Sequence, residues 1–215
     1  MVIGLLAITS IPTVIGVGQA ISAQKRQAAA QSKEQEKFHL IAMVCLDGND
    51  FQDACVCMLK DGRLYLNLPD FPVAGHRFCG YYFKYPGEEG HLGMVSTIAD
   101  DPPMLNWIFV DAETHAVRHG GRKDTVGHVI GPWGWSEDER FLVLEGGFDK
   151  FIAVKEQAPT PAAEDEGGSS DGPPRWAVYW DPDGRRQAEA GTGDVLPLRL
   201  RRQPLLGIAS RYVKD

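Results

Sequence analysis

Histidines and cysteines are the residues of this chain that could hold a metal ion. His115 and His119 lie four positions apart, the spacing of a zinc-binding helix, but no glutamate lies between them. The segment is typical of a strand, in which positions four apart are separated by about 13 Å, too far to share one zinc ion. A further set of four potential ligands lacks paired Cys-x-x-Cys spacing: Cys55, Cys57, Cys79 and His76. We expect no metal and no cofactor.

Six other side chains are candidates for contact with a ligand or a partner. They are His91, His128, Asp100, Asp101, Trp133 and Trp135. Acids near aromatic rings occur in glycosidases and sugar-binding sites, although acids adjacent in sequence seldom face one substrate. A tryptophan exposed on a loop is a typical interaction hot spot. The chain has no Gly-x-Ser-x-Gly elbow and no phosphate-binding loop, so we predict no catalytic residue and favour a protein that is not an enzyme.

The elements that must position these residues are short strands. Apolar runs between turn signals fall at 38–46, 54–60, 63–68, 80–85, 106–110, 115–119, 140–144, 150–154, 175–180 and 196–200. Asp61-Gly62 predicts a tight hairpin, residues 140–154 predict another, and Pro197 places its strand at a sheet edge. We predict an antiparallel β-sandwich or barrel over residues 38–204, preceded by an N-terminal helix, with no internal repeat.

Charge and composition narrow the class of protein. A chain with 43% hydrophobic and 24% charged residues is of ordinary globular type. Five acids of the stretch 156–174 supply most of the net charge of −7, and −7 + 5 leaves −2 for the rest. That near-neutral remainder gives no electrostatic reason to expect nucleic acid binding. Residues 157–174 are rich in Pro, Gly, Ser and acids, which predicts a disordered acidic insertion between two strands.

The N-terminal part differs from the β-rich domain. Residues 1–24 carry no charged side chain, and Lys25 and Arg26 follow. Such a segment could lie in or across a membrane with the basic pair on the cytoplasmic side, act as a signal peptide, or pack on the domain or a partner. Residues 25–37 have the composition of a polar helical stalk. Residues 205–215 form a C-terminal tail.

Three sequence blocks resemble a known family. They are residues 100–114, 127–133 and 176–184. In these blocks the chain is similar to a family of small uncharacterised proteins of filamentous fungi, whose members also tend to begin with an apolar segment and a Gln- and Lys-rich stretch. The resemblance covers most of the chain and implies a fungal source and a domain that is a unit in itself. It brings no activity, cofactor or residue role.

Three functional hypotheses follow. The first is a non-enzymatic interaction module, tethered by its N-terminal helix to a membrane or to a protein partner, which favours an intracellular, membrane-associated location. The second is a small-ligand-binding β-barrel, or an enzyme built on one. The third is a secreted fungal protein in which the four cysteines form two disulfides, although buried free thiols in a reducing compartment are the expectation we prefer.

Overall fold

The computed structural model describes residues 24–25, 33–45, 50–87, 90–159, 171–189 and 194–205. The chain divides into two compact units, residues 1–35 and 36–215, and every strand belongs to the second. The strands are β1 (Phe38–Val44), β2 (Gln52–Lys60), β3 (Arg63–Leu66), β4 (His76–Arg77), β5 (Gly80–Lys84), β6 (Leu92–Asp100), β7 (Pro103–Val110), β8 (Val117–Gly120), β9 (Trp133–Trp135), β10 (Leu142–Leu144), β11 (Phe151–Pro159), β12 (Asp171–Trp180) and β13 (Val195–Pro204). A 3-10 turn η1 (Arg122–Thr125) and a short helix α2 (Arg185–Glu189) complete the described elements.

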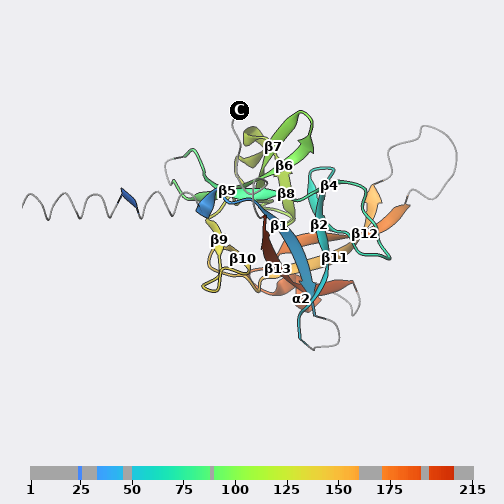
Figure 1. Ribbon diagram of the computed structural model, residues 1–215. Coiled ribbons are helices and arrows are strands. Elements are labelled where there is room, and N and C mark those ends of the chain that lie inside the picture. The colour runs from blue at the N-terminus through green and yellow to red at the C-terminus, as the bar shows by residue number, and fades with distance from the viewer. Residues whose placement is uncertain are drawn as a thin grey trace, which may run out of the picture. The chain divides into compact units, whose positions relative to one another are not determined.

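The strands form a closed antiparallel barrel (Figure 1). The main sheet runs β12-β11-β13-β1-β5-β6-β7-β8-β3-β2-β4, and β12 also pairs with β3, which closes nine of the strands into a ring. The prediction of a mainly β antiparallel barrel is therefore confirmed. Closure removes most of the unpaired strand edges that would otherwise invite association with another chain.

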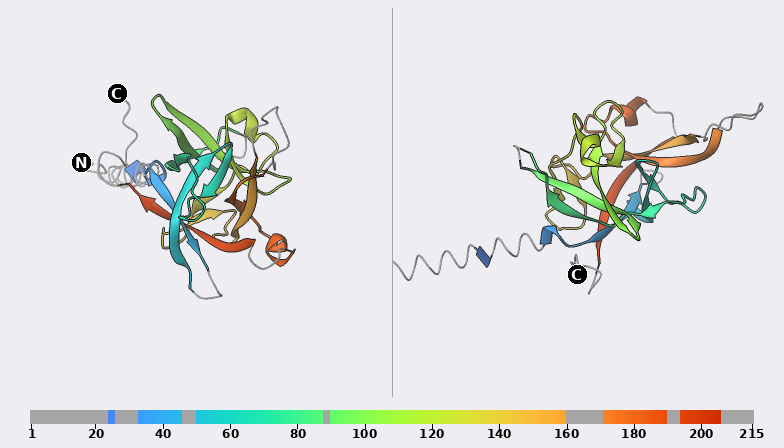
Figure 2. Two further views of the ribbon diagram at one scale, coloured as in Figure 1. Left: turned by 90° about the vertical axis from the view of Figure 1, so that its right-hand side faces the viewer. Right: turned by 90° about the horizontal axis from the view of Figure 1, so that it is seen from above.

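Three hairpins meet inside this arrangement. They are β2–β3, β7–β8 and β11–β12, and β3 pairs with both β8 and β12. A bridge between Ala116 and Tyr179 joins the start of β8 to β12. The other strands connect in the order β13-β1-β5-β6, and β9 pairs with β10. The two views of Figure 2 show these strands wound around one centre.

The domain thus consists of three units of four strands, with β4 as an addition: β1, β2, β3 and β5; then β6 to β9; then β10 to β13. The sequence gives no sign of this internal repeat. The inner hairpin strands read Arg63-Leu-Tyr-Leu66, Val117-Arg-His-Gly120 and Trp176-Ala-Val-Tyr-Trp180, which share few residue types and differ in their patterns of buried positions. A strand requires only that alternate residues face the core, so the fold can repeat while the sequence does not.

The interior is filled by side chains. Strand β1 alternates buried and half-buried positions along its whole length, and its buried residues join those of every other unit in one core. Aromatic rings occupy much of this space: Phe38, Phe78, Tyr82, Trp133, Phe151, Trp176 and Trp180. These aromatic side chains pack together at the centre of the barrel, which is the arrangement expected of a small barrel.

One buried cation lies among these rings. Arg202, 5% exposed, has its guanidinium 4.6 Å from the ring centre of Phe38, 5.2 Å from that of Tyr82 and 5.3 Å from that of Trp135. Its Nη1 donates to the carbonyl of Glu139 at 3.1 Å. Cation–π contacts are strongest where water is excluded, so Arg202 fastens the end of β13 to β1, β5 and β9.

The expected edge position of Pro197 is wrong. Strand β13 pairs with β1 from Leu198 to Pro204 and with β11 from Val195 to Leu198, so it has partners on both sides. The carbonyl of Pro197 accepts the N–H of Cys45, which places its imide nitrogen on the β1 side as well. Regular pairing with β1 begins only at the next residue, so the missing N–H removes no ladder bond.

The expected hairpin over residues 140–154 is also wrong. Strand β10 pairs with β9, whereas β11 pairs with β12 and β13. Mutual hydrogen bonds between Leu144 and Gly147 make a tight turn that redirects the chain instead. The predicted insertion 157–174 also differs at its ends, because β11 extends to Pro159 and β12 begins at Asp171. Residues 160–170 lie outside the described part of the chain.

Most of the N-terminal calls concern residues outside the described ranges. Residues 1–23 are outside them, and the helical pairs at 24–25 and 33–34 are too short to establish the expected helix. No helix within the described residues is long and apolar enough to cross a bilayer. The four cysteines all fall in the described part, and no disulfide joins any of them. Of the expected C-terminal tail only Leu205 is described, where its N–H donates to the carbonyl of Lys37.

Candidate functional site

The two candidate tryptophans are packed into the protein. Trp133 is 2% exposed, and its indole stacks on Phe151 with ring centres 6.4 Å apart. Trp135 packs against the core and lies 5.2 Å from the ring centre of Tyr82. The expected exposed hot spot is therefore not Trp133, because this side chain has almost no surface left for a partner.

The two candidate aspartates lie at the tip of the β6–β7 hairpin. Asp100 is the last residue of β6, and its side chain is 91% exposed, with one contact of 3.2 Å to Nε2 of His76. Asp101 follows in the exposed turn before Pro103, the first residue of β7. Neither residue lines the cavities described below, so these acids do not join the candidate histidines in one site.

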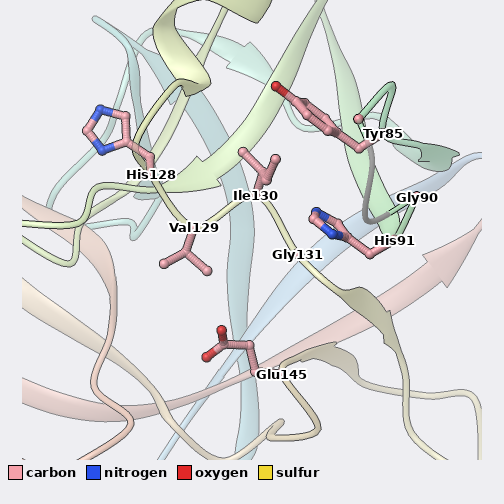
Figure 3. Close-up of a pocket in the computed structure, with 9 residues that line it drawn as sticks. Tyr85, Gly90, His91, His128, Val129, Ile130, Gly131 and Glu145 are labelled. Carbon is pink, nitrogen blue, oxygen red and sulfur yellow. The ribbon is translucent and has the colours of Figure 1, made fainter.

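The two candidate histidines, by contrast, line one cleft of about 500 Å³. We call it the loop cleft. Its lining is Tyr85, Gly87, Gly90, His91, His128, Val129, Ile130, Gly131 and Glu145. Figure 3 shows Tyr85 and His91 on one side of the cleft, His128 and Val129 on the other, and Glu145 apart from both pairs. Three connections supply these residues: β5–β6, η1–β9 and β10–β11.

The connection between η1 and β9 is fastened to strand β7. Val129 and Val110 exchange two backbone hydrogen bonds, of 2.8 and 3.0 Å. Nδ1 of His128 accepts the N–H of Ala112 at 3.1 Å, and its ring stacks on Phe109 with centres 5.2 Å apart. Because Nδ1 accepts, the proton of a neutral His128 lies on Nε2. The histidine is thus held at a fixed angle beside the cleft.

The opposite wall depends on a close approach of two backbones. Gly131 has φ of +153°, and a Cβ atom at this position would lie 2.6 Å from the carbonyl oxygen of Leu92. Only glycine permits this approach, which brings His91 to the cleft. The Tyr85 N–H donates to the carbonyl of His91 at 3.0 Å, and the Tyr85 hydroxyl lies 2.8 Å from Oγ1 of Thr125. The first bond closes the β5–β6 connection on itself, and the second ties it to η1.

Glu145 brings a carboxylate to the cleft from the turn after β10. Its backbone has φ of +47°, an uncommon value for a residue other than glycine. Its N–H donates to the carbonyl of Pro132 at 3.0 Å, and the mutual bonds between Leu144 and Gly147 close the turn around it. The side chain is exposed, so the carboxylate is available to a ligand.

A second cavity, of about 520 Å³, adjoins the loop cleft and shares His128 with it. Its lining is Phe109, Arg118, His119, Lys123, Asp124, Val126 and His128. Much of its polar surface already has internal partners. Arg118 pairs with Asp111 at 3.0 Å, and Nδ1 of His119 lies 3.1 Å from the amide nitrogen of Asn106. Burial lowers the pKa of His119, which favours its neutral form.

An aromatic surface next to the loop cleft was missed by the sequence analysis. Trp107 lies across Gly93, where a Cβ atom would come within 2.7 Å of the indole. The ring centre of Trp107 is 6.2 Å from that of Phe83 and 5.0 Å from that of Tyr85, both edge-on. Phe83 is 46% exposed. The aromatic run at residues 81–85 and the glycine opposite it are the sequence signals that could have indicated this surface.

The described residues contain no group of three or more His, Cys, Asp or Glu side chains placed to hold a metal ion. Cys57 lies in the apolar core, and Cys55 packs against it. Burial raises the pKa of Cys55 to about 11 and raises that of Cys57 well above its usual value. A buried thiol of this kind stays protonated and reacts slowly.

Comparison with known proteins identifies the family. The model of a fungal beta-trefoil domain family matches residues 16–205. Searches of the curated proteins and of the solved structures give no significant match. The three four-strand units and their three converging hairpins agree with a trefoil arrangement, and the match agrees with the fungal family that the three sequence blocks indicate. On these findings, the chain belongs to the fungal beta-trefoil domain family.

Proposed function

We propose that this protein is a non-enzymatic binding module and that the loop cleft is its ligand site. The observation that carries the proposal is the composition of the cleft. Side chains from three separate connections converge on one concave site of about 500 Å³, within the usual size range of small-molecule sites. Side chains of the core pack inside the barrel beneath, whereas the cleft lies among the connections and is open to a ligand.

The polar atoms of the cleft favour binding over catalysis. The Tyr85 hydroxyl is engaged by Thr125, and Nδ1 of His128 is engaged by the Ala112 N–H. A hydroxyl nucleophile needs an adjacent general base that activates it, and the Tyr85 hydroxyl contacts the Thr125 hydroxyl instead. Here the hydrogen bonds hold loops in place, which gives a ligand site of fixed shape. Preorganisation of this kind lowers the entropic cost of binding.

Fragment binding to a cleft-filling variant tests the proposal. Ile130→Trp adds an indole to the lining and breaks no hydrogen bond that we observe at Ile130. Met104→Trp adds the same indole on β7, at a residue that is 52% exposed and outside the cleft. A library of small polar fragments is screened by ligand-observed NMR. We expect some fragments to bind the unmodified protein and Met104→Trp but not Ile130→Trp. The three proteins should have equal melting temperatures. If binding persists in Ile130→Trp, the site lies elsewhere.

The tether remains part of the proposal. We infer that the uncharged residues 1–24 attach the domain to a membrane or a protein partner through a helix, because they precede a basic pair and are apolar enough for either role. Fractionation of the full chain and of a copy lacking residues 1–24, with a carbonate wash, tests this. Attachment to a membrane requires that the full chain stays with membranes and the shortened copy does not. Two soluble forms would place the segment at a protein contact instead.

A further inference from the structure

The charge of the loop cleft indicates the class of ligand. Of the nine described residues that line it, one is an acid, Glu145, and two are histidines, His91 and His128. No lysine or arginine belongs to the lining. Cations lie outside this lining: Arg122 donates to the carbonyl of Pro86 at 2.9 Å, the Lys84 side chain lies beside Gly90, and Arg118 and Lys123 line the adjoining cavity. An anionic ligand would therefore face a carboxylate in the cleft without a cation in the lining.

The aromatic wall has the complementary property. The rings of Tyr85 and His91 stack with centres 5.9 Å apart and planes within 8° of each other. Trp107 meets Tyr85 edge-on at 5.0 Å, which fixes the tyrosine ring from outside the cleft. The face of the Tyr85 ring can attract an organic cation through its quadrupole, as aromatic sites do for quaternary ammonium groups, and the stacked His91 ring supports that tyrosine. Val129 and Ile130 add apolar surface for the alkyl parts of such a ligand.

The backbone of Glu145 is fixed relative to this wall, and its exposed side chain extends from that point. Figure 3 shows Glu145 reaching the cleft from a different connection than Tyr85 and His91. The bond from its N–H to Pro132 holds it against the chain segment that continues Gly131 into β9. A ligand between the two elements would thus meet negative charge on one side and aromatic surface on another. This pairing is the general recognition chemistry of ammonium compounds.

From this arrangement we infer that the loop cleft binds a small organic cation, an amine or a quaternary ammonium compound, with Glu145 as the counter-charge and Tyr85 and His91 as the aromatic wall. The inference rests on the proposed function, because it names the ligand class of the same site. It goes further in excluding anions of similar size and in assigning separate roles to residues from two connections.

Choline and its uncharged isostere 3,3-dimethylbutan-1-ol are suitable probes, because they share shape and differ in charge. Each is titrated into the full-length protein at constant ionic strength, and binding is followed by NMR shifts of cleft residues. We expect choline to bind about tenfold more tightly than the alcohol, the factor that corresponds to about 1.4 kcal/mol for one partly solvated charge contact. Glu145→Gln should remove most of this preference and bring the choline affinity close to that of the alcohol, with the remainder supplied by Tyr85. Tyr85→Leu should weaken choline more than the alcohol.

Asp149→Asn is the matched control, because Asp149 is an exposed acid of the same connection that does not line the cleft. Its choline affinity should stay within twofold of that of the unmodified protein. Equal affinity for the two probes, or a Glu145→Gln variant that binds choline normally, would overturn the cation inference and leave the cleft as a ligand site. The cation inference also fails if neither probe binds whereas neutral or anionic fragments bind and lose their affinity in Ile130→Trp. If no fragment responds to Ile130→Trp, the proposed function itself fails.

Discussion

Asp111 is the residue whose replacement tests the scaffold of the cleft most sharply. Its side chain is 9% exposed and accepts three hydrogen bonds at the β7–β8 turn. Oδ1 accepts the N–H of Thr114 at 2.9 Å and of Glu113 at 3.1 Å, and Oδ2 accepts Nη1 of Arg118 at 3.0 Å. The same turn presents the Ala112 N–H that binds His128. Asp111→Asn keeps the size of the side chain and removes its charge.

The expected cost follows from these contacts. The asparagine can still accept the two backbone N–H groups through Oδ1, but its amide nitrogen faces the Arg118 donor. Hydrogen bonds to a charged group contribute about 1.5–3 kcal/mol. The Arg118 side chain is 43% exposed, so water can solvate it after the change, which limits the penalty. We expect Asp111→Asn to lower the free energy of unfolding by about 2 kcal/mol at neutral pH.

The pH dependence of this cost has a definite sign. The N–H of Thr114, and then the guanidinium of Arg118, hold the pKa of Asp111 well below its usual range in the folded protein. A carboxyl whose pKa is lower when folded stabilises the protein fully above its unfolded pKa, and the contribution is lost as the pH falls toward the folded pKa. The gap between the unmodified protein and Asp111→Asn should be constant near neutral pH and narrow below about pH 4.

Urea unfolding followed by tryptophan fluorescence measures both quantities. Asp183→Asn is the control, because its side chain is 60% exposed and makes only a 3.5 Å contact with Arg185. That variant should lose less than about 0.5 kcal/mol. An Asp111→Asn variant that unfolds like the control at neutral pH, or whose deficit stays the same at pH 3, would refute the reasoning.

Further predictions concern the cleft backbone, the core and the thiols. Gly131→Ala places a Cβ atom 2.6 Å from the Leu92 carbonyl oxygen at a strained φ. We expect the free energy of unfolding, measured in urea, to fall by about 2–4 kcal/mol, and fragment binding, measured by NMR, to be lost. Trp133→Ala should lower the free energy of unfolding by about 3–5 kcal/mol in the same assay, and a decrease below about 1 kcal/mol would show that the indole does not belong to the core. Cys55 and Cys57 should resist iodoacetamide at pH 8 until the protein unfolds, because burial raises the pKa of both thiols. Mass spectrometry measures the modification, and carboxamidomethyl groups on these thiols in the folded protein would contradict the prediction.

The strands themselves were predictable from local sequence. Asp61-Gly62 between apolar runs indicates the β2–β3 hairpin, and the structure pairs Lys60 with Arg63 across it. The alternation at residues 196–200 likewise indicates β13. Such features depend on residues next to one another in the chain. Strand pairing depends on distant residues, which is why β10 was assigned to β11 as a hairpin although it pairs with β9.

The candidate site was predictable only in part. His91 and His128 were selected as polar loop residues, and both line the loop cleft. Glu145 and Tyr85 were not selected, because their approach depends on Gly131 and on the turn after β10, which connect segments far apart in sequence. Trp133 was selected as a tryptophan that could be exposed on a loop. The pairing of β9 with β10 turns it into the core instead.

Mapping a bound ligand onto the protein tests the central claim most directly. The full-length chain, labelled with ¹⁵N, is titrated with choline and with the fragments found in the screen, and the shift of every assigned amide is followed. We predict that the largest changes fall at Gly90, His91, Gly131 and Glu145, which come from three connections and meet only in the loop cleft. Changes confined to the β6–β7 tip or to surfaces away from these residues would contradict the assignment of the cleft as the ligand site.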